Sequence, residues 1–217
     1  MNHALPPDST KHRILNAAES LFSEHGFEAT SLRRITTAAS VNLAAVNYHF
    51  QSKEALLDAV VQRRATPINQ RRYELLEQYE TGAAGKPVAV EQILDALLRP
   101  VVESGVIVPR LLVRLQSMES SELFKRIFDA HLKTVAERFA GALLRSLPEI
   151  PPTEVFLRMH FVIGAFVQLM AAGHSLQIIT EGRAPALSPD AAVQRLIRFA
   201  AAGLKTPAYE EAHAAKS

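Results

Sequence analysis

Cysteine is absent from this chain of 217 residues, so the sequence offers neither a disulfide framework nor a thiolate for catalysis or metal binding. It also lacks a GxSxG sequence, a phosphate-binding glycine loop and an HExxH motif, which are short signatures of enzymes. No two of the eight histidines lie within four residues of each other, which disfavours a metal site. We therefore predict a protein that is not an enzyme and that uses no cofactor and no metal.

Uninterrupted hydrophobic runs are also missing, because the apolar stretch at residues 153–180 is broken by His160, Gln168 and His174. The first ten residues, MNHALPPDST, show no basic start followed by an apolar run. We expect no signal peptide, no membrane partner and a cytoplasmic location. With 48% hydrophobic residues, the chain has enough apolar side chains for a substantial core.

Acidic residues are missing from one segment in particular. Residues 29–53, ATSLRRITTAASVNLAAVNYHFQSK, contain no Asp or Glu, although the whole chain has 22. Because the net charge is only +2, the segregation of charge rather than its total indicates a nucleic-acid surface. Two short helical patterns, at 32–39 and 42–49, are separated by a Ser-Val-Asn break. This arrangement is typical of a helix-turn-helix, whose second helix enters the major groove of DNA.

Helical periodicity assigns a face to each side chain of these two patterns. In the first, Leu32, Ile35 and Ala39 form an inward stripe, and Arg33 and Arg34 point outward. In the second, Asn42 is predicted to be the N-cap. The inward residues are predicted to be Leu43, Val46 and Phe50, and the outward residues Ala44, Ala45, Asn47 and Tyr48.

The rest of the chain is predicted to be helical as well, because Pro and Gly punctuate stretches of 3.6-residue periodicity and no alternating strand pattern is present. We predict an all-α fold of about nine helices. After three short helices, Ser52 caps a long one at 53–80, and Ser188-Pro189-Asp190 begins the last. The later helices are expected at about 90–104, 109–117, 120–147, 153–180 and 189–203, followed by a frayed tail from Lys205.

The N-terminal third resembles the DNA-binding domain of the TetR/AcrR family of bacterial repressors. The resemblance covers about residues 10–60 and is carried by ILNAAESLFSEHGF, Thr30-Ser31, Ala38-Ala39-Ser40-Val41 and YHFQSKEAL. Ser40 stands where the family usually has glycine, and Leu43 and Asn47 stand where many members have Lys and Tyr. The bases that this chain recognises are therefore expected to differ from those that other members of the family recognise. VNLAAVNYHFQSKEAL and PPTEVFLRMHFVIGAF are similar to the fatty-acid-responsive branch typified by PsrA.

This resemblance implies a TetR-like organisation. It consists of an arm at 1–9, a three-helix helix-turn-helix domain at 10–56, a ligand-binding and dimerisation domain at 57–204 and a tail at 205–217. The helices of about 153–203 are then expected to form the interface of a homodimer that binds a palindromic operator. The side chain of Asn47 can hydrogen-bond to the edge of an adenine, and Ala45 can pack against the methyl group of a thymine. DNA contacts are expected from Thr30, Arg33, Arg34, Asn42, Ala45, Asn47, Tyr48, His49 and Lys53.

The family default is a repressor that a small lipophilic inducer releases from DNA. The candidate lining is Leu98, Arg114, Met118, Phe128, His131, Phe156, His160, Ile163 and Val167, although an ordinary core explains most of these residues equally well. Arg114 and His160 are the candidates for the ligand headgroup, since polar groups in apolar surroundings need partners. A fatty acid or acyl-CoA is favoured by resemblance. An alternative within the same functional class is a drug-responsive efflux repressor with an aromatic ligand. An alternative from a different functional class is a helical adaptor protein that does not bind DNA.

Overall fold

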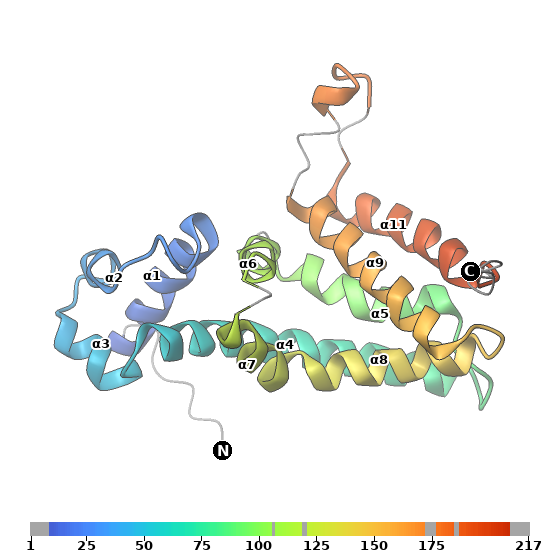
Figure 1. Cartoon of the computed structure of the whole chain (residues 1–217), viewed down its shortest axis with the longest axis horizontal. Coiled ribbons are helices and arrows are strands. Elements are labelled where there is room, and N and C mark those ends of the chain that lie inside the picture. Colours follow the sequence, from blue (N-terminus) through green and yellow to red (C-terminus); the bar gives the residue numbers. More distant parts are fainter. Residues whose placement is uncertain (1–8, 106, 119–120, 172–176, 185–186, 209–217) are drawn as a thin grey trace, which may run out of the picture. The chain divides into compact units, whose positions relative to one another are not determined.

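The computed structural model describes residues 9–105, 107–118, 121–171, 177–184 and 187–208, and this part of the chain is helical without a strand (Figure 1). The predicted all-α fold is confirmed. The described residues form ten helices of eight or more residues, rather than the nine that the sequence predicted. They are α1 (Thr10–His25), α2 (Leu32–Ala39), α3 (Leu43–Phe50), α4 (Lys53–Gly82), α5 (Val90–Glu103), α6 (Ile107–Gln116), α7 (Glu122–His131), α8 (Lys133–Ser146), α9 (Pro152–Ala171) and α11 (Pro189–Lys205).

Three predicted helix caps are present. The side-chain oxygens of Asn42, Ser52 and Ser188 accept hydrogen bonds from the backbone amides three residues later, at 2.9, 3.0 and 3.2 Å. Ser40 ends α2 in the left-handed conformation, with a φ of 52°. In that position Ser40 and Val41 donate their amides back to the last carbonyls of α2, which turns the chain into α3.

The chain divides by its contacts into two compact units, one made of residues up to 70 with 100–135 and the other of 71–99 with 136 onward. The first unit therefore contains α6 and α7 in addition to the three short N-terminal helices. Its core includes Leu111 and Leu115 from α6 and Ile127 from α7 beside Phe22 and Ile35. The units defined by packing therefore differ from the two domains that the sequence suggested, which were divided at residue 56.

A buried ion cluster joins α1 to α4 within the first unit. The carboxylate of Glu19, which is only 2% exposed, pairs with the guanidinium groups of Arg63 and Arg64. Arg63 also donates to the side-chain oxygen of Asn16 at 2.8 Å. Burial, together with the neighbouring Arg64, lowers the pKa of Arg63. Since a buried carboxylate needs such partners, this cluster fixes how α1 lies on α4.

The single helix predicted at 120–147 is wrong, because the chain breaks at Leu132 into α7 and α8. Leu132 caps α7 and donates its amide to Phe128. The side-chain amide of Asn69, on α4, donates to the carbonyl of His131 at 2.8 Å. This bond from a distant residue satisfies a carbonyl at the end of α7, where intrahelical donors run out.

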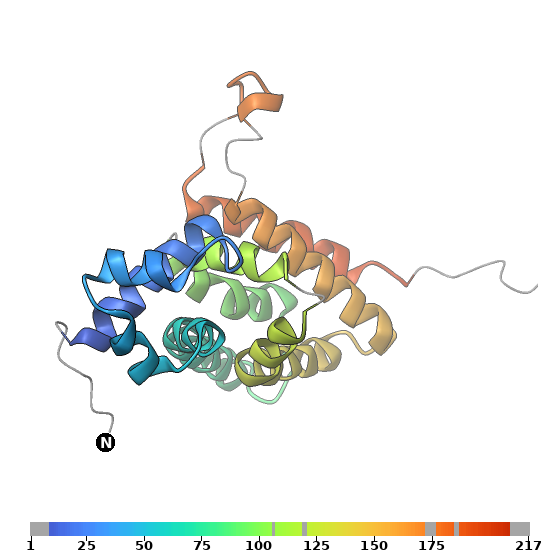
Figure 2. The same cartoon turned by 60° about the vertical axis from the view of Figure 1, so that its left-hand side comes forward.

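The second unit is built from the later part of α4, most of α5, and α8, α9 and α11, with Leu94, Phe139 and Ile197 among its buried side chains. Glu80 on α4 pairs with Arg138 and Arg145 on α8, and the hydrogen bond from Arg138 lowers the pKa of Glu80. The helices α9 and α11 lie side by side in Figures 1 and 2, in orange and red.

Arg158, buried on α9, holds the C-terminal end of α11. Its terminal nitrogens donate to the carbonyl oxygens of Gly203, Leu204, Thr206 and Pro207 at 2.5 to 3.1 Å, and its Nε donates to Glu154 at 2.8 Å. These bonds hold the chain as far as Pro207, so the prediction of a frayed tail from Lys205 is corrected for residues 205–207. Residues 209–217 and the arm at 1–8 lie outside the described residues.

The helix α9 ends at Ala171 rather than near Thr180, and residues 172–176, which include His174, lie outside the described residues. A separate helical turn follows at 177–179. By length and composition alone, Pro152–Met170 of α9 is apolar enough to cross a membrane, and 22% of that stretch is buried. Its exposed residues include Phe156, Leu157 and Phe161. The helix therefore has an apolar outer face that the described residues leave uncovered.

Candidate nucleic-acid interface

The helix α3 presents one face to the core of the first unit and the other to solvent. Val46 and Phe50 are buried, whereas Ala44 and Asn47 are exposed and Tyr48 is 83% exposed. An exposed tyrosine on a short, well-capped helix is available to a partner, because none of the described residues of its unit covers it. The predicted outward positions of Ala44, Asn47 and Tyr48 are confirmed.

Two assignments on α3 are corrected. Leu43, predicted to face the core, is 50% exposed, whereas Ala45, predicted to face the groove, is half-buried and packs against the core. Side chains in a helix point toward its N-terminus, so Leu43 in the first turn has no preceding helical turn beneath it. Val41 occupies the neighbouring space against the core instead. Leu43 therefore belongs to the outer face of α3, and Ala45 does not.

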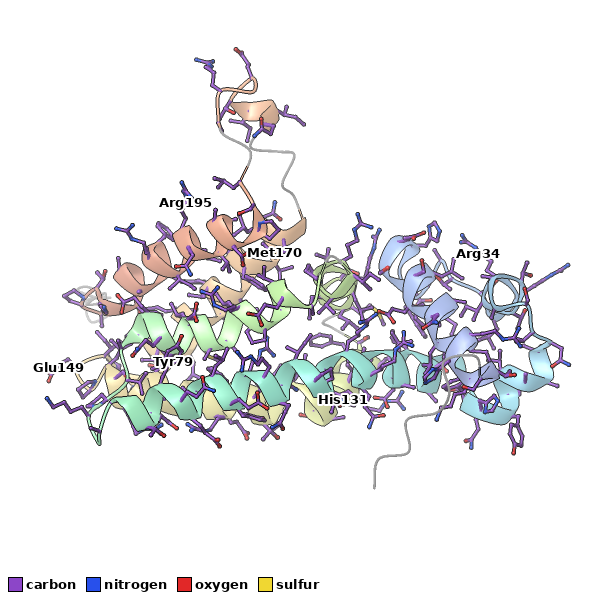
Figure 3. All side chains as sticks on the ribbon, turned by 180° about the vertical axis from the view of Figure 1, so that it is seen from behind. Arg34, Tyr79, His131, Glu149, Met170 and Arg195 are labelled. Atoms are coloured by element: carbon purple, nitrogen blue, oxygen red, sulfur yellow. The ribbon has the colours of Figure 1, made fainter. Side chains whose placement is uncertain are left out.

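Cationic groups surround α3 on neighbouring elements. Arg33 and Arg34 are exposed on α2, and Figure 3 shows Arg34 projecting away from its helix. These two arginines line a groove of about 410 Å³ together with Leu21, Ser31, Thr37 and Ala38. Lys53 begins α4, and its Nζ lies 4.1 Å from the ring centroid of Phe27 in a cation–π contact.

Thr30 is removed from the set of candidate contacts. Its side chain is fully buried, and its hydroxyl lies within hydrogen-bonding distance of the carbonyl oxygens of Gly26 and Leu21, at 2.7 and 3.2 Å. The N-cap of α2 is Ser31, which accepts from the amide of Arg34 at 3.2 Å. A threonine used in this way shapes the turn before α2, so its hydroxyl cannot reach a phosphate.

The remaining predicted contacts lie on or beside α3. Asn42 is exposed, but its side-chain oxygen already accepts from the amide of Ala45, which leaves its NH₂ group and one lone pair of that oxygen for another partner. His49 is half-buried, and its ring lies 5.1 Å from the ring of Tyr48 and 6.1 Å from that of Phe50, between centroids. His49 is therefore placed to support Tyr48 as well as to contact DNA.

Lys11 was missed by the sequence argument. It lies in the first turn of α1, with its Nζ 5.9 Å from the ring centroid of Phe50 at the end of α3. Ser9 caps α1 by accepting from the amide of His12 at 3.3 Å. A signal was present, because Lys11, His12 and Arg13 follow a good N-cap residue.

Two exposed glutamates, Glu28 and Glu54, flank the acid-free segment at residues 29–53. Glu54, just after it, has a lowered pKa because its own backbone amide and the Ser52 hydroxyl hydrogen-bond to its carboxylate. That carboxylate is thus ionised at neutral pH, but it is held at the first turn of α4. Glu19 is buried and already paired with arginines.

The predicted ligand residues are divided between the two units. Arg114 is exposed and donates to the carbonyl of Glu24 on α1 at 2.7 Å, so its expected role as a buried headgroup donor is wrong. His131 is engaged with Asp58, 2.8 Å from Nε2 to Oδ1. Met118 and Phe128 are half-buried. All four residues belong to the first unit.

The other five predicted ligand residues lie in the second unit. Leu98 and Val167 are buried and Ile163 is half-buried. His160 is exposed and Phe156 is half exposed, on the outer face of α9, so the expectation that they line an interior pocket is corrected. Among the residues that the structure describes, no group of three His, Asp or Glu side chains is placed to bind a metal.

Comparison with known proteins decides the family. Residues 14–60 match the family described as bacterial regulatory proteins, tetR family, and residues 91–203 match the tetracyclin repressor-like C-terminal domain. The chain belongs to the TetR family. This family consists of transcription regulators rather than enzymes, and α2 and α3 form its helix-turn-helix.

Curated relatives of this TetR-family protein are most alike at the N-terminus. The transcriptional regulator UidR of Escherichia coli is 42% identical over 52 residues, 24% of this chain and 26% of that protein. The chain thus spans about a quarter of the length of that relative. The transcriptional repressor AcnR of Corynebacterium glutamicum is 22% identical over 184 residues, 81% of this chain and 89% of the relative.

Solved structures share the fold along most of this TetR-family chain. A TetR-family regulator from Bordetella parapertussis aligns with a TM-score of 0.66 at 17% identity, covering 89% of this chain and 94% of that one. Salmonella enterica GusR aligns with a TM-score of 0.60 at 18% identity, and the alignment covers 94% of this chain and 100% of the GusR chain. These comparisons support the family as a whole and do not single out the fatty-acid-responsive branch.

Proposed function

We propose that this TetR-family protein is a cytoplasmic repressor that binds a palindromic operator as a homodimer and leaves it when a lipophilic small molecule binds. The observation that carries the proposal is the outer face of α3, where Tyr48, Asn47 and Leu43 are exposed between cationic groups. Base edges are read by the recognition helix, and phosphates are held by the positive groups around it. An adaptor without DNA binding would have no use for this segregation of charge.

The roles within the footprint follow from side-chain chemistry. Asn47 can pair with N6 and N7 of adenine in the major groove. Arg33, Arg34, Lys53 and Lys11 supply positive charge for phosphates. Selection from a pool of random duplexes by the purified protein is expected to enrich a palindrome. Enrichment of no sequence would count against the proposal.

The homodimer is supported by the outer faces of α9 and α11. On α9, Leu157, Phe161 and Gln168 are exposed at helical spacing, with the small residues Gly164 and Ala165 between them. On α11, Phe199 is 77% exposed, and Arg195 projects into solvent from the same helix (Figure 3). Exposed aromatic side chains on adjacent helices mark an interaction surface, and small residues allow close helix approach. A two-fold pairing of this surface would present two copies of α3 to a palindrome.

Replacing Lys53 by alanine is expected to reduce the salt dependence of DNA binding. Removal of one phosphate contact lowers the slope of log affinity against log salt by about one unit per protomer, which is about two units for the proposed dimer. The measurement is the affinity for one duplex at a series of salt concentrations. Lys86, exposed and outside the DNA-binding unit, gives a matched control in Lys86→Ala, which should leave the slope unchanged. If Lys53→Ala also leaves the slope unchanged, Lys53 makes no phosphate contact.

A lipophilic inducer is proposed to bind the C-terminal helices, with the buried Leu98 and Val167 and the half-buried Ile163 as candidate contacts. The helix α4 is continuous from the unit that carries α3 into the unit that contains these residues, so its movement could change the spacing of two recognition helices. A ligand releases DNA only if it prefers one spacing over the other.

Long-chain acyl compounds are the first candidates for this inducer, and aromatic drugs are the second. A ligand at 100 times its dissociation constant is expected to stabilise the protein by about 2.7 kcal/mol. Thermal unfolding and release of the selected operator should therefore be measured with the same panel of compounds. The acyl assignment is wrong if acyl compounds neither raise the melting temperature nor release the operator. If an aromatic compound does both of these things, the drug-responsive alternative holds.

A further inference from the structure

The outer face of α3 carries no side chain with a permanent charge. Between Val41 and Ser52 the sequence has no Asp, Glu, Lys or Arg. The exposed positions are instead Leu43, Ala44, Asn47 and Tyr48, of which Leu43 is 50% and Tyr48 83% exposed. Arginine or lysine on guanine is the commonest specific base contact of DNA-binding proteins, and α3 cannot make it. Base reading by α3 therefore rests on apolar contacts and uncharged hydrogen bonds.

Leu43 is held in a fixed place at the start of α3. The amide of Ala45 donates to both the side-chain and the backbone oxygen of Asn42, at 2.9 and 3.2 Å, and this closes the first turn. A leucine in the first turn leans toward the helix N-terminus. The N-terminal residues of a recognition helix are those that contact base edges. Leu43 thus lies where a base pair would meet α3.

Only one base presents an apolar group in the major groove, and that group is the C5-methyl of thymine. Opposite Leu43, guanine or cytosine would lose the hydration of its hydrogen-bonding groups without gaining a partner. A thymine methyl loses nothing and buries apolar surface. Leu43 therefore favours thymine and penalises guanine and cytosine.

We propose that Leu43 reads thymine by packing against its methyl group in each half-site of the operator. This inference rests on the proposed function and adds the base class that α3 selects. Ala45, which the sequence had suggested for a thymine contact, is turned toward the core, so Leu43 takes that role. Because the contact is uncharged, the ratio of operator affinity to random-duplex affinity should change little with salt, while both affinities fall.

The test removes the methyl group alone. The operator selected from random duplexes is synthesised with uracil in place of thymine, one symmetric pair of positions at a time, and its affinity for the full-length protein is measured. Thymines outside the half-sites serve as matched controls. Removing one buried methyl group should weaken binding about fourfold, so a symmetric pair should weaken it roughly 15-fold.

The same duplexes are then measured with Leu43→Ala, whose melting temperature is compared with that of the unaltered protein to show that it is folded. The variant should bind the thymine and uracil operators equally well. Our inference is overturned if no thymine within the half-sites is sensitive to its methyl group, or if Leu43→Ala keeps the full sensitivity. If selection enriches no duplex at all, the proposed DNA-binding function fails, and the inference with it.

Discussion

Replacing Arg158 by methionine is expected to lower the free energy of unfolding by about 3 to 5 kcal/mol, because it removes a buried guanidinium group that hydrogen-bonds to four carbonyl oxygens and to the partly buried Glu154. Arg158 holds four carbonyl oxygens at the end of α11 and the carboxylate of Glu154 on α9. Methionine preserves much of the apolar volume but donates no hydrogen bond. The carbonyls at the end of α11 would then lose their donor.

The measurement is denaturant unfolding of both proteins at one fixed concentration, since dimer formation would make apparent stability depend on concentration. Lys205→Met is the matched control at the same end of α11. The Lys205–Glu91 pair spans 2.6 Å, but its side chains are 47% and 45% exposed, so its loss should cost less than about 1 kcal/mol. Equal losses for the two variants would mean that Arg158 is no more than a surface contact.

Replacing Phe161 by glutamate is expected to separate the proposed dimer into monomers. Phe161 is 60% exposed in the middle of the outer face of α9, so a dimer through this face would bury two introduced carboxylates without partners. A monomer engages one half-site instead of two. Its operator affinity should fall by about 10² to 10⁴-fold, because the second half-site no longer binds as part of the same molecule.

Sedimentation velocity at micromolar concentration reports the change in assembly, and operator titration reports its consequence. The control is Thr134→Glu, which adds the same charge at an exposed position of α8. It should leave both measurements unchanged. A Phe161→Glu protein that is folded, dimeric and fully active on DNA would exclude this face as the interface.

Local signals made much of the fold predictable from the sequence. Asn42, Ser52 and Ser188 each cap a helix through an amide three residues away, so the information lies within four consecutive residues. The inward stripe of Ile35 and Ala39 follows from periodicity alone. These features placed the helix-turn-helix and the last helix correctly.

Contacts between residues far apart in the sequence were beyond this kind of reasoning. The break at Leu132 is stabilised by Asn69, and Arg114 is drawn to the surface of α1 by the carbonyl of Glu24. Neither partner can be identified from spacing or composition. Leu43 was misplaced for a different reason, because periodicity assigns a face but ignores that a first-turn side chain has no preceding turn to pack on.

Affinity of the Asn47→Ala protein for the selected operator and for a random duplex tests the central claim most directly, namely that the exposed face of α3 reads DNA bases. Asn47 is exposed, so its removal should not disturb the fold. We expect the variant to lose about 1 to 3 kcal/mol on the operator and nothing on the random duplex. An equal loss on both duplexes, or no loss on either, would contradict the account.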